Sequence, residues 1–183
     1  MRPDRQNKPE PKGMGRFKQQ TIAGMVIAIA LLIASPLSQA QTLSLNVNPS
    51  SISFADQNPT NFPSISASAI VQVQVTASWG NGTWSVTSLA GGDLLNSDGR
   101  SVIPISNMRW TASRASGSCS GGCTCMGGTA SKSSPQHILN GSGYTGFLGF
   151  GSYTCNVNFT LVNDWSYNTG SYSQSLTVTA ANP

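Results

Sequence analysis

The sequence predicts an all-β protein, a single antiparallel β-sandwich of seven or eight short strands. Apolar and polar residues alternate with period two in several segments, as in strands with one buried and one solvated face. Turn-forming residues separate these segments at short intervals. Beyond the first 40 residues, no segment has the period of an amphipathic helix. An up-and-down barrel would satisfy the same pattern.

The first 40 residues have the organisation of a secretory signal-peptide helix. A basic stretch ends at Lys18, and an apolar run covers residues 21–34. Small residues at Ser38 and Ala40 place the cleavage site between Ala40 and Gln41. The run is shorter than the roughly 20 residues that cross a bilayer as a helix, which favours a cleaved signal over a retained anchor.

The formal net charge of +4 comes entirely from this leader. The first 18 residues hold six basic residues (Lys or Arg) and two acidic residues (Asp4 and Glu10). The positive and negative charges of the remaining chain balance. The basic region is long for a signal, so Met14 is an alternative start to Met1. A neutral body lacks the clustered Lys and Arg that follow phosphates, so we expect no nucleic-acid partner.

The mature chain, residues 41–183, supplies the strands of one domain. The clearest alternation covers residues 42–47, 71–79, 153–161 and 172–180. Shorter strands are expected at 51–55, 83–89, 101–106 and 107–113. The Asn81-Gly82 pair predicts a tight hairpin after residue 79, because Asn-Gly readily adopts positive φ.

Residues 114–151 differ from the rest of the mature chain. Ten of these 38 residues are glycine, and three of the four cysteines lie here. We expect an insertion into the sandwich, with residues 136–139 as a candidate strand. Long loops of this kind often carry function.

The last strands resemble the closing strands of immunoglobulin-like sandwich domains in secreted bacterial surface and pilus-type proteins. The residues that carry the resemblance are Asp164-Trp165, Gly170-Ser-Tyr172 and Leu176-Thr-Val-Thr179, and Val47–Phe54 resembles the first strand pair. The resemblance implies an immunoglobulin-like fold and a role in binding or assembly. Only Cys155 lies on an expected core strand, unlike the cysteine pair of antibody-type domains, so no functional residue is carried over.

The cysteines Cys119, Cys123, Cys125 and Cys155 indicate two disulfides in an exported chain. A Cys123–Cys125 bridge would close a short, strained ring. This disfavours the pairing of Cys123–Cys125 with Cys119–Cys155. We favour Cys119–Cys123 with Cys125–Cys155 over Cys119–Cys125 with Cys123–Cys155. The spacing lacks the paired motifs of zinc sites, and no basic residue within the cluster would activate a thiolate.

The mature chain is poor in catalytic groups. It has no Glu, its one histidine is His137, and no Gly-x-Ser-x-Gly elbow precedes a helix. A blue copper site needs two His and one Cys as ligands, and one copy of this chain has a single His. We therefore expect no enzymatic activity, no metal and no cofactor.

Aromatic side chains and strand edges are the candidate binding features. The strand phase assigns Trp79, Trp84 and Trp110 to the core, and we expect Trp165 and Tyr144 to be exposed. Strand 171–180 carries no charge, so its edge suits pairing with a protein partner or another copy.

The sequence therefore predicts a secreted, periplasmic or cell-surface protein that acts by binding or subunit assembly. No stable membrane span is expected after processing. The alternative is a carbohydrate-binding or adhesive module that uses exposed aromatic residues and the 114–151 loop.

Overall fold

The computed structural model describes residues 41–168 and 170–182. The predicted signal-peptide helix, the cleavage residue Ala40 and the choice between Met1 and Met14 lie outside these residues. In the described part every regular element is a β-strand, apart from one 3₁₀ turn at Ile105–Asn107. All strand pairs are antiparallel, so the prediction of an all-β antiparallel fold is confirmed.

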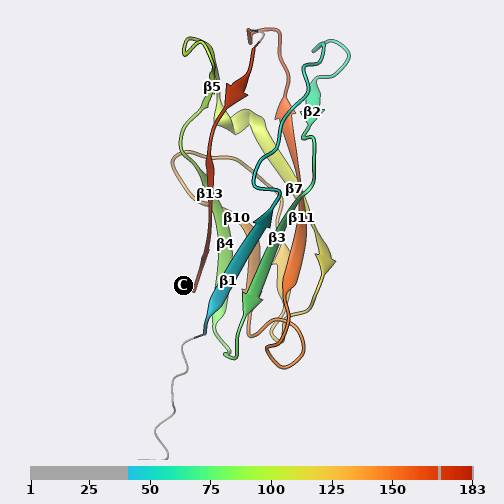
Figure 1. The fold of residues 1–183 in the computed structure, drawn as a ribbon, viewed down its shortest axis with the longest axis vertical. Helices are drawn as coiled ribbons and strands as arrows, with labels where there is room; N and C mark the ends of the chain where they lie inside the picture. Colours follow the sequence, from blue (N-terminus) through green and yellow to red (C-terminus); the bar gives the residue numbers. More distant parts are fainter. Residues whose placement is uncertain (1–40, 169, 183) are drawn as a thin grey trace, which may run out of the picture. The chain divides into compact units, whose positions relative to one another are not determined.

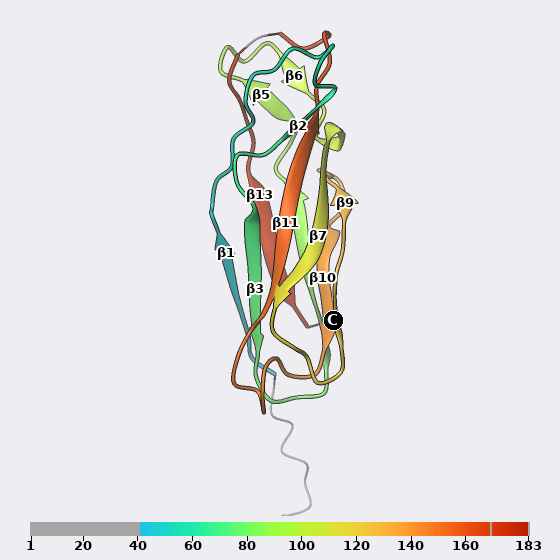
Figure 2. The same cartoon turned by 90° about the vertical axis from the view of Figure 1, so that its right-hand side faces the viewer.

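Two sheets hold the long strands and face each other across one core (Figure 1). The first has the order β1-β3-β11-β7-β9, with β2 paired to β11, and Figure 2 shows β1, β3, β11 and β7 side by side. The second sheet has the order β13-β4-β10-β8, and a small third sheet has the order β12-β5-β6. The bounds are β1 Leu43–Asn48, β2 Ser64–Ser66, β3 Val71–Ala77, β4 Thr83–Ala90, β5 Leu94–Asn96, β6 Val102–Ile103, β7 Met108–Ser116, β8 Cys123–Cys125, β9 Gly128–Thr129, β10 Gln136–Ser142, β11 Tyr153–Val162, β12 Tyr172–Ser173 and β13 Leu176–Ala181.

The first sheet lines the core with the alternating residues of β3 and β11. Val75 and Val157 are fully buried, and Cys155 pairs in register with Val73. Trp110 on β7 lies opposite Phe159, with ring centroids 5.9 Å apart. Because the period is two, every second side chain of these strands leaves water, which is the main favourable term for the fold.

The second sheet covers this core with Trp84 of β4 and with Ile138 and Leu139 of β10. The β4–β10 register shifts between His137 and Leu139, so two consecutive residues of β10 are buried. Trp84 is 1% exposed and its Nε1 donates a hydrogen bond to the carbonyl oxygen of Gly143 at 2.9 Å. The core positions predicted for Trp84 and Trp110 are confirmed.

Residues 114–151 build part of the sandwich instead of forming an insertion beside it. They supply the end of β7 and all of β8, β9 and β10, and β10 lies between β4 and β8. The candidate strand 136–139 belongs to β10. A glycine is required at position 141, since a Cβ there would lie 2.2 Å from the Trp84 ring.

Several local predictions are wrong. β3 ends at Ala77, so its alternation does not reach Trp79, which is 47% exposed. β3 and β4 belong to different sheets, so residues 78–82 cross between sheets and form no hairpin. The expected strand 51–55 is reduced to one bridge between Phe54 and Ala67, and the expected strand 101–106 becomes β6 followed by the 3₁₀ turn.

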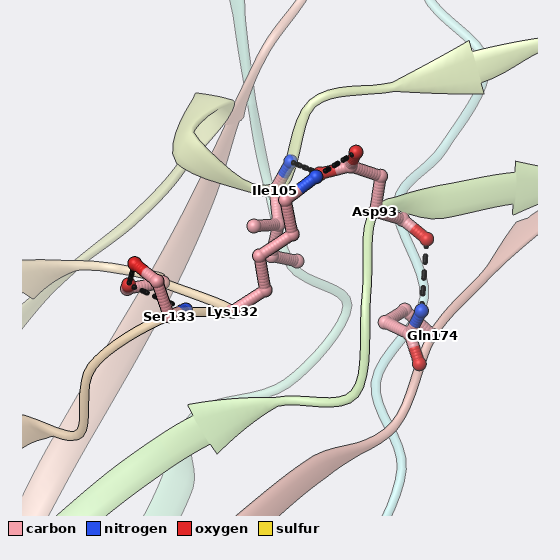
Figure 3. A network of polar contacts seen from close by, with 6 residues as sticks. Asp93, Ile105, Lys132, Ser133 and Gln174 are labelled. Atoms are coloured by element: carbon pink, nitrogen blue, oxygen red, sulfur yellow. Dashed lines mark hydrogen bonds and ion pairs between the residues drawn. The ribbon is translucent and has the colours of Figure 1, made fainter.

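Asp93, in the β4–β5 connection, joins four separate parts of the chain (Figure 3). Its Oδ1 accepts a hydrogen bond from the Ile105 N–H at 3.0 Å, and its Oδ2 pairs with Lys132 Nζ at 2.5 Å. Its carbonyl oxygen accepts a hydrogen bond from Gln174 Nε2 at 2.8 Å. The Lys132 side chain, and then the Ile105 N–H, lower the pKa of Asp93 below the ordinary aspartate value.

Acid is expected to weaken the fold through Asp93. Its pKa is lower in the folded than in the unfolded chain, so its contribution is complete above the ordinary aspartate pKa and is lost as the pH falls through the lowered value. We expect Asp93→Asn to lower the thermal midpoint at about pH 6 and to shrink the further drop between about pH 6 and pH 3. Asp56→Asn, at an exposed carboxylate, is the matched control. Parallel pH profiles for Asp93→Asn and the parent protein would contradict this prediction.

Candidate binding site

The four cysteines form two disulfides, Cys119–Cys123 and Cys125–Cys155. These are the pairs favoured from the sequence. Cys119–Cys123 closes a short turn before β8, whereas Cys125–Cys155 joins β8 of the second sheet to β11 of the first. The sequence predicted a strand position for Cys155 alone. Its partner, Cys125, lies on strand β8 of the facing sheet.

The disulfides bear on the compartment in which the chain folds. All four cysteines are paired, and disulfides of this kind are typical of proteins that fold in an oxidising, extracytoplasmic environment. The Cys125–Cys155 bridge also ties the glycine-rich segment to the core, since Cys155 is completely buried.

A cleft of about 370 Å³ lies at the end of the sandwich that carries β2 and β6. Its apolar floor comes from Ile65, Ile103 and Leu161. Other lining residues come from two segments, 54–59 and 162–165 with Tyr167, Asn168, Gly170 and Tyr172, which are far apart in the sequence but meet where β2 pairs with β11. Four aromatic rings line the cleft together with carboxylates and amides: Phe54, Trp165, Tyr167, Tyr172, Asp56, Asp164, Gln57, Asn58, Asn163 and Asn168.

Trp165 is the most exposed of these rings, at 69%. Its Nε1 donates a hydrogen bond to Thr60 Oγ1 at 3.2 Å, so the indole is held across from the chain segment 54–60. The Tyr172 hydroxyl donates to the carbonyl oxygen of Asn168 at 2.8 Å. These contacts fix two aromatic rings beside open polar groups, with much of the Trp165 surface left in water.

Hydrogen bonds also order the polar wall of the cleft. Asn163 Nδ2 donates to the carbonyl oxygens of Gln57 at 2.8 Å and Phe62 at 3.0 Å, which ties the two walls together. The Asp164 carboxylate accepts the Ser166 N–H at 2.8 Å. That N–H, followed by the Ser166 side chain, lowers the pKa of Asp164, so this carboxylate is an anionic acceptor at neutral pH.

The other residues singled out from the sequence lie away from this cleft. His137 is exposed on β10, opposite Thr87 of β4. Trp79 and Tyr144 contact each other at the opposite end of the sandwich, with ring centroids 5.3 Å apart. Tyr144, predicted to be exposed, is half-buried there. Gln41, at the predicted cleavage site, also lies at that end, where its Nε2 donates to the carbonyl oxygen of Gly143 at 2.8 Å.

The sequence identified Trp165 as exposed but missed the rest of the cleft. Of the wall residues 54–59, the first two end the expected strand 51–55 and the others follow it, and nothing local indicates that this segment meets the chain around Asp164 and Trp165. The cluster Asp164-Trp165 with Asn163, Tyr167 and Asn168 was the available signal, because aromatic and amide residues concentrate there in a turn.

Within residues 41–168 and 170–182, no group of three His, Cys, Asp or Glu side chains lies close enough to hold a metal ion. No helix in the same part of the chain is long and apolar enough to cross a bilayer.

Comparisons with known proteins returned no match: no family model, no curated protein and no solved structure resembles this chain significantly.

Proposed function

We propose that this chain is an exported, non-enzymatic surface protein that acts by binding, and that its ligand is a glycan held in the cleft. The observation that carries the proposal is Trp165, an exposed indole on the rim of a 370 Å³ cleft that also presents carboxylate and amide groups. A pyranose ring has apolar C–H faces, which stack on such a ring, and hydroxyl groups, which pair with carboxylates and amides.

The arrangement of strands supports a binding role without fixing a family. Seven strands of the described part have six or more residues, and four lie in the first sheet and three in the second. In constant-type immunoglobulin domains the fifth of seven strands lies in the four-stranded sheet and the sixth in the other. In this protein the fifth long strand, β10, lies in the second sheet, and the sixth long strand, β11, lies in the first sheet. The sheet assignment of these two strands is therefore the reverse of that in an immunoglobulin domain. The proposal therefore takes from immunoglobulin-like proteins the two-sheet plan and the binding role, and not the strand connections.

Binding to a glycan array, followed by titration of the best ligand in a calorimeter, tests the glycan proposal. We expect Trp165→Ala to weaken binding by at least about tenfold, since the loss of one stacked ring amounts to roughly 1.4 kcal/mol or more. Trp79→Ala removes an equally aromatic, half-exposed residue at the opposite end and should leave the affinity unchanged.

Two results would contradict the glycan proposal. One is the absence of binding to any glycan on the array. The other is an equal loss of affinity in the Trp165→Ala and Trp79→Ala variants, which would place the ligand elsewhere.

Assembly with other protein chains is the second candidate function, and strand β13 favours it. Among the strands of residues 41–168 and 170–182, β13 pairs with β4 alone, so it is an edge of the second sheet. Residues 165–182 contain no charged side chain, and charges are a common device that keeps edges from pairing. Sedimentation velocity at increasing concentration should then show growing species, whereas a constant monomer would count against self-assembly.

A further inference from the structure

Five apolar or aromatic residues lie on the β10–β11 and β3–β4 connections. Both connections lie at the end of the sandwich opposite β2 and β5 (Figure 1). We call this set the aromatic tip: Trp79, Tyr144, Phe147, Leu148 and Phe150. Phe147 and Phe150 are 80% and 76% exposed, and Leu148 is 43% exposed. Exposed apolar groups that cluster in this way mark an interaction surface more often than single exposed residues do.

A tight turn presents the three most protruding side chains. The Phe150 N–H donates to the Phe147 carbonyl oxygen at 2.9 Å, and φ is 51° at Leu148 and 78° at Gly149. Positive φ at both central positions defines a type I′ turn, in which the first position is usually Asn, Asp or Gly. A bulky leucine is disfavoured in this conformation, and among the described residues Leu148 is the one non-glycine with positive φ. A strained leucine that gains little burial indicates a role outside the fold.

The turn is held rigidly on the body of the domain. Thr145, just before it, is fully buried, and its hydroxyl accepts the Ala77 N–H at 2.9 Å and donates to the Gly151 carbonyl oxygen at 2.8 Å. The Gly146 N–H donates to the Ser118 carbonyl oxygen at 2.8 Å. Gly149 packs against Trp79, where a Cβ would lie 3.1 Å from the indole. The apolar side chains are therefore preorganised and lose little freedom when they are buried by a partner.

The surroundings of the tip fit a lipid surface. The loops at this end, residues 78–82, 117–122 and 143–152, contain no charged residue. Phe and Leu enter the acyl region of a bilayer, and Trp and Tyr are enriched at its interface, where one part of the ring is apolar and the other wet. A convex turn is suited to insertion into such a fluid phase.

The described chain enters the domain at the same end. Gln41 lies here, with its Nε2 bonded to Gly143. The apolar run 21–34 ends seven residues before Gln41, and seven residues span at most about 25 Å. The aromatic tip therefore lies at the end of the domain where the described chain begins, seven residues after this apolar run in the sequence.

We infer that the aromatic tip inserts into the interface of a lipid bilayer and docks the domain on a membrane, with the cleft at the far end. This surface is separate from the cleft, so it does not depend on the proposed glycan binding. The inserted groups are Phe147, Leu148 and Phe150, with Trp79 and Tyr144 at the interface.

Vesicle co-sedimentation tests this inference with residues 41–183, which contain all the strands and core residues that the structure describes. The probes are vesicles of phosphatidylcholine alone and of phosphatidylcholine with phosphatidylglycerol, at about 1 mM lipid. We expect binding to both, unchanged in about 0.5 M NaCl, because the tip is uncharged. Phe147→Ser with Phe150→Ser should weaken partitioning on the order of tenfold for each phenylalanine removed.

Phe62→Ser is the matched control, because Phe62 is 50% exposed at the cleft end. It should bind vesicles like the parent protein. In a Trp165→Phe background, where Trp79 is the remaining exposed tryptophan, vesicles should shift the emission to shorter wavelength. Near-ultraviolet circular dichroism and the intact mass of the disulfide-bonded chain confirm that each variant is folded.

Three outcomes would overturn the inference. One is the absence of co-sedimentation at this lipid concentration. Another is equal binding by the double variant and by Phe62→Ser. The third is self-association without lipid that the double variant abolishes, together with no vesicle binding, which would make a second copy of the chain the occupant of the tip.

Discussion

Trp84→Ala is expected to lower the free energy of unfolding by about 3–5 kcal/mol. Trp84 is the largest of the fully buried side chains, its indole N–H is satisfied by Gly143, and it fills the space left by Gly141 on the neighbouring strand. Truncation removes the apolar surface and leaves a cavity between the sheets, which the paired strands β4 and β10 cannot close. Urea denaturation followed by circular dichroism gives the difference between the variant and the parent protein.

Trp165→Ala is the matched control for this substitution. The same atoms are removed from a side chain that is 69% exposed and whose indole N–H donates to Thr60 Oγ1. We expect a change within about 0.5 kcal/mol. Similar losses for the two variants would mean that Trp84 does not carry the packing between the sheets.

Removal of the Cys125–Cys155 disulfide is expected to cost about 3–4 kcal/mol, and removal of Cys119–Cys123 about 2 kcal/mol. The first bridge closes a loop with a sequence separation of 30 and joins the two sheets, whereas the second has a separation of 4. A longer loop restricts the unfolded chain more, so its bridge stabilises the folded state more. Cys125→Ala with Cys155→Ala also leaves a gap at the fully buried Cys155.

The two double alanine variants control for each other in urea denaturation. Each removes two sulfur atoms and one bridge, and they differ in loop length and in burial of the cysteines. A larger loss for Cys119→Ala with Cys123→Ala would contradict the role of Cys125–Cys155 as the clamp between the sheets. The m-value should be compared as well, because a disulfide also limits the expansion of the unfolded chain.

The two proposed surfaces lie at opposite ends of the sandwich and differ in chemistry. The cleft presents ordered hydrogen-bonding groups around an exposed indole, whereas the aromatic tip presents apolar side chains without nearby charges. A domain attached to a membrane through the tip would direct the cleft outward. Trp165 and Phe147 can be changed separately, so the two proposals are tested independently.

Local alternation in the sequence was sufficient to assign β1, β3, β11 and β13 and their inward faces. A period of two depends only on the geometry of one strand, so it can be observed before the partners of that strand are known. It assigned Val75, Val157 and Trp110 to the core for this reason. It failed for Trp79, since nothing in the pattern marks the end of β3 at Ala77.

The pairing of strands was decided by the tertiary structure alone. Asn81-Gly82 is a local hairpin signal, but β3 pairs with β1 and β11 in one sheet, whereas β4 pairs with β13 and β10 in the other. β10 shows no clean alternation because of the shift at His137 and the glycine that accommodates Trp84, so its central position required the partner strands.

The number and spacing of the cysteines were enough to prefer one of the three possible disulfide pairings. The strain of a small disulfide ring depends on how few residues separate its two cysteines, and this spacing can be read from the sequence. The position of Cys125 on the facing sheet, the cleft and the aromatic tip depend on contacts between distant parts of the chain. The sequence separation is 30 for Cys125 and Cys155, 101 for Asn163 and Phe62, and 68 for Thr145 and Ala77. Contacts over such distances leave no periodic trace in the sequence, since each loop is free to vary while the sheets hold the ends in place.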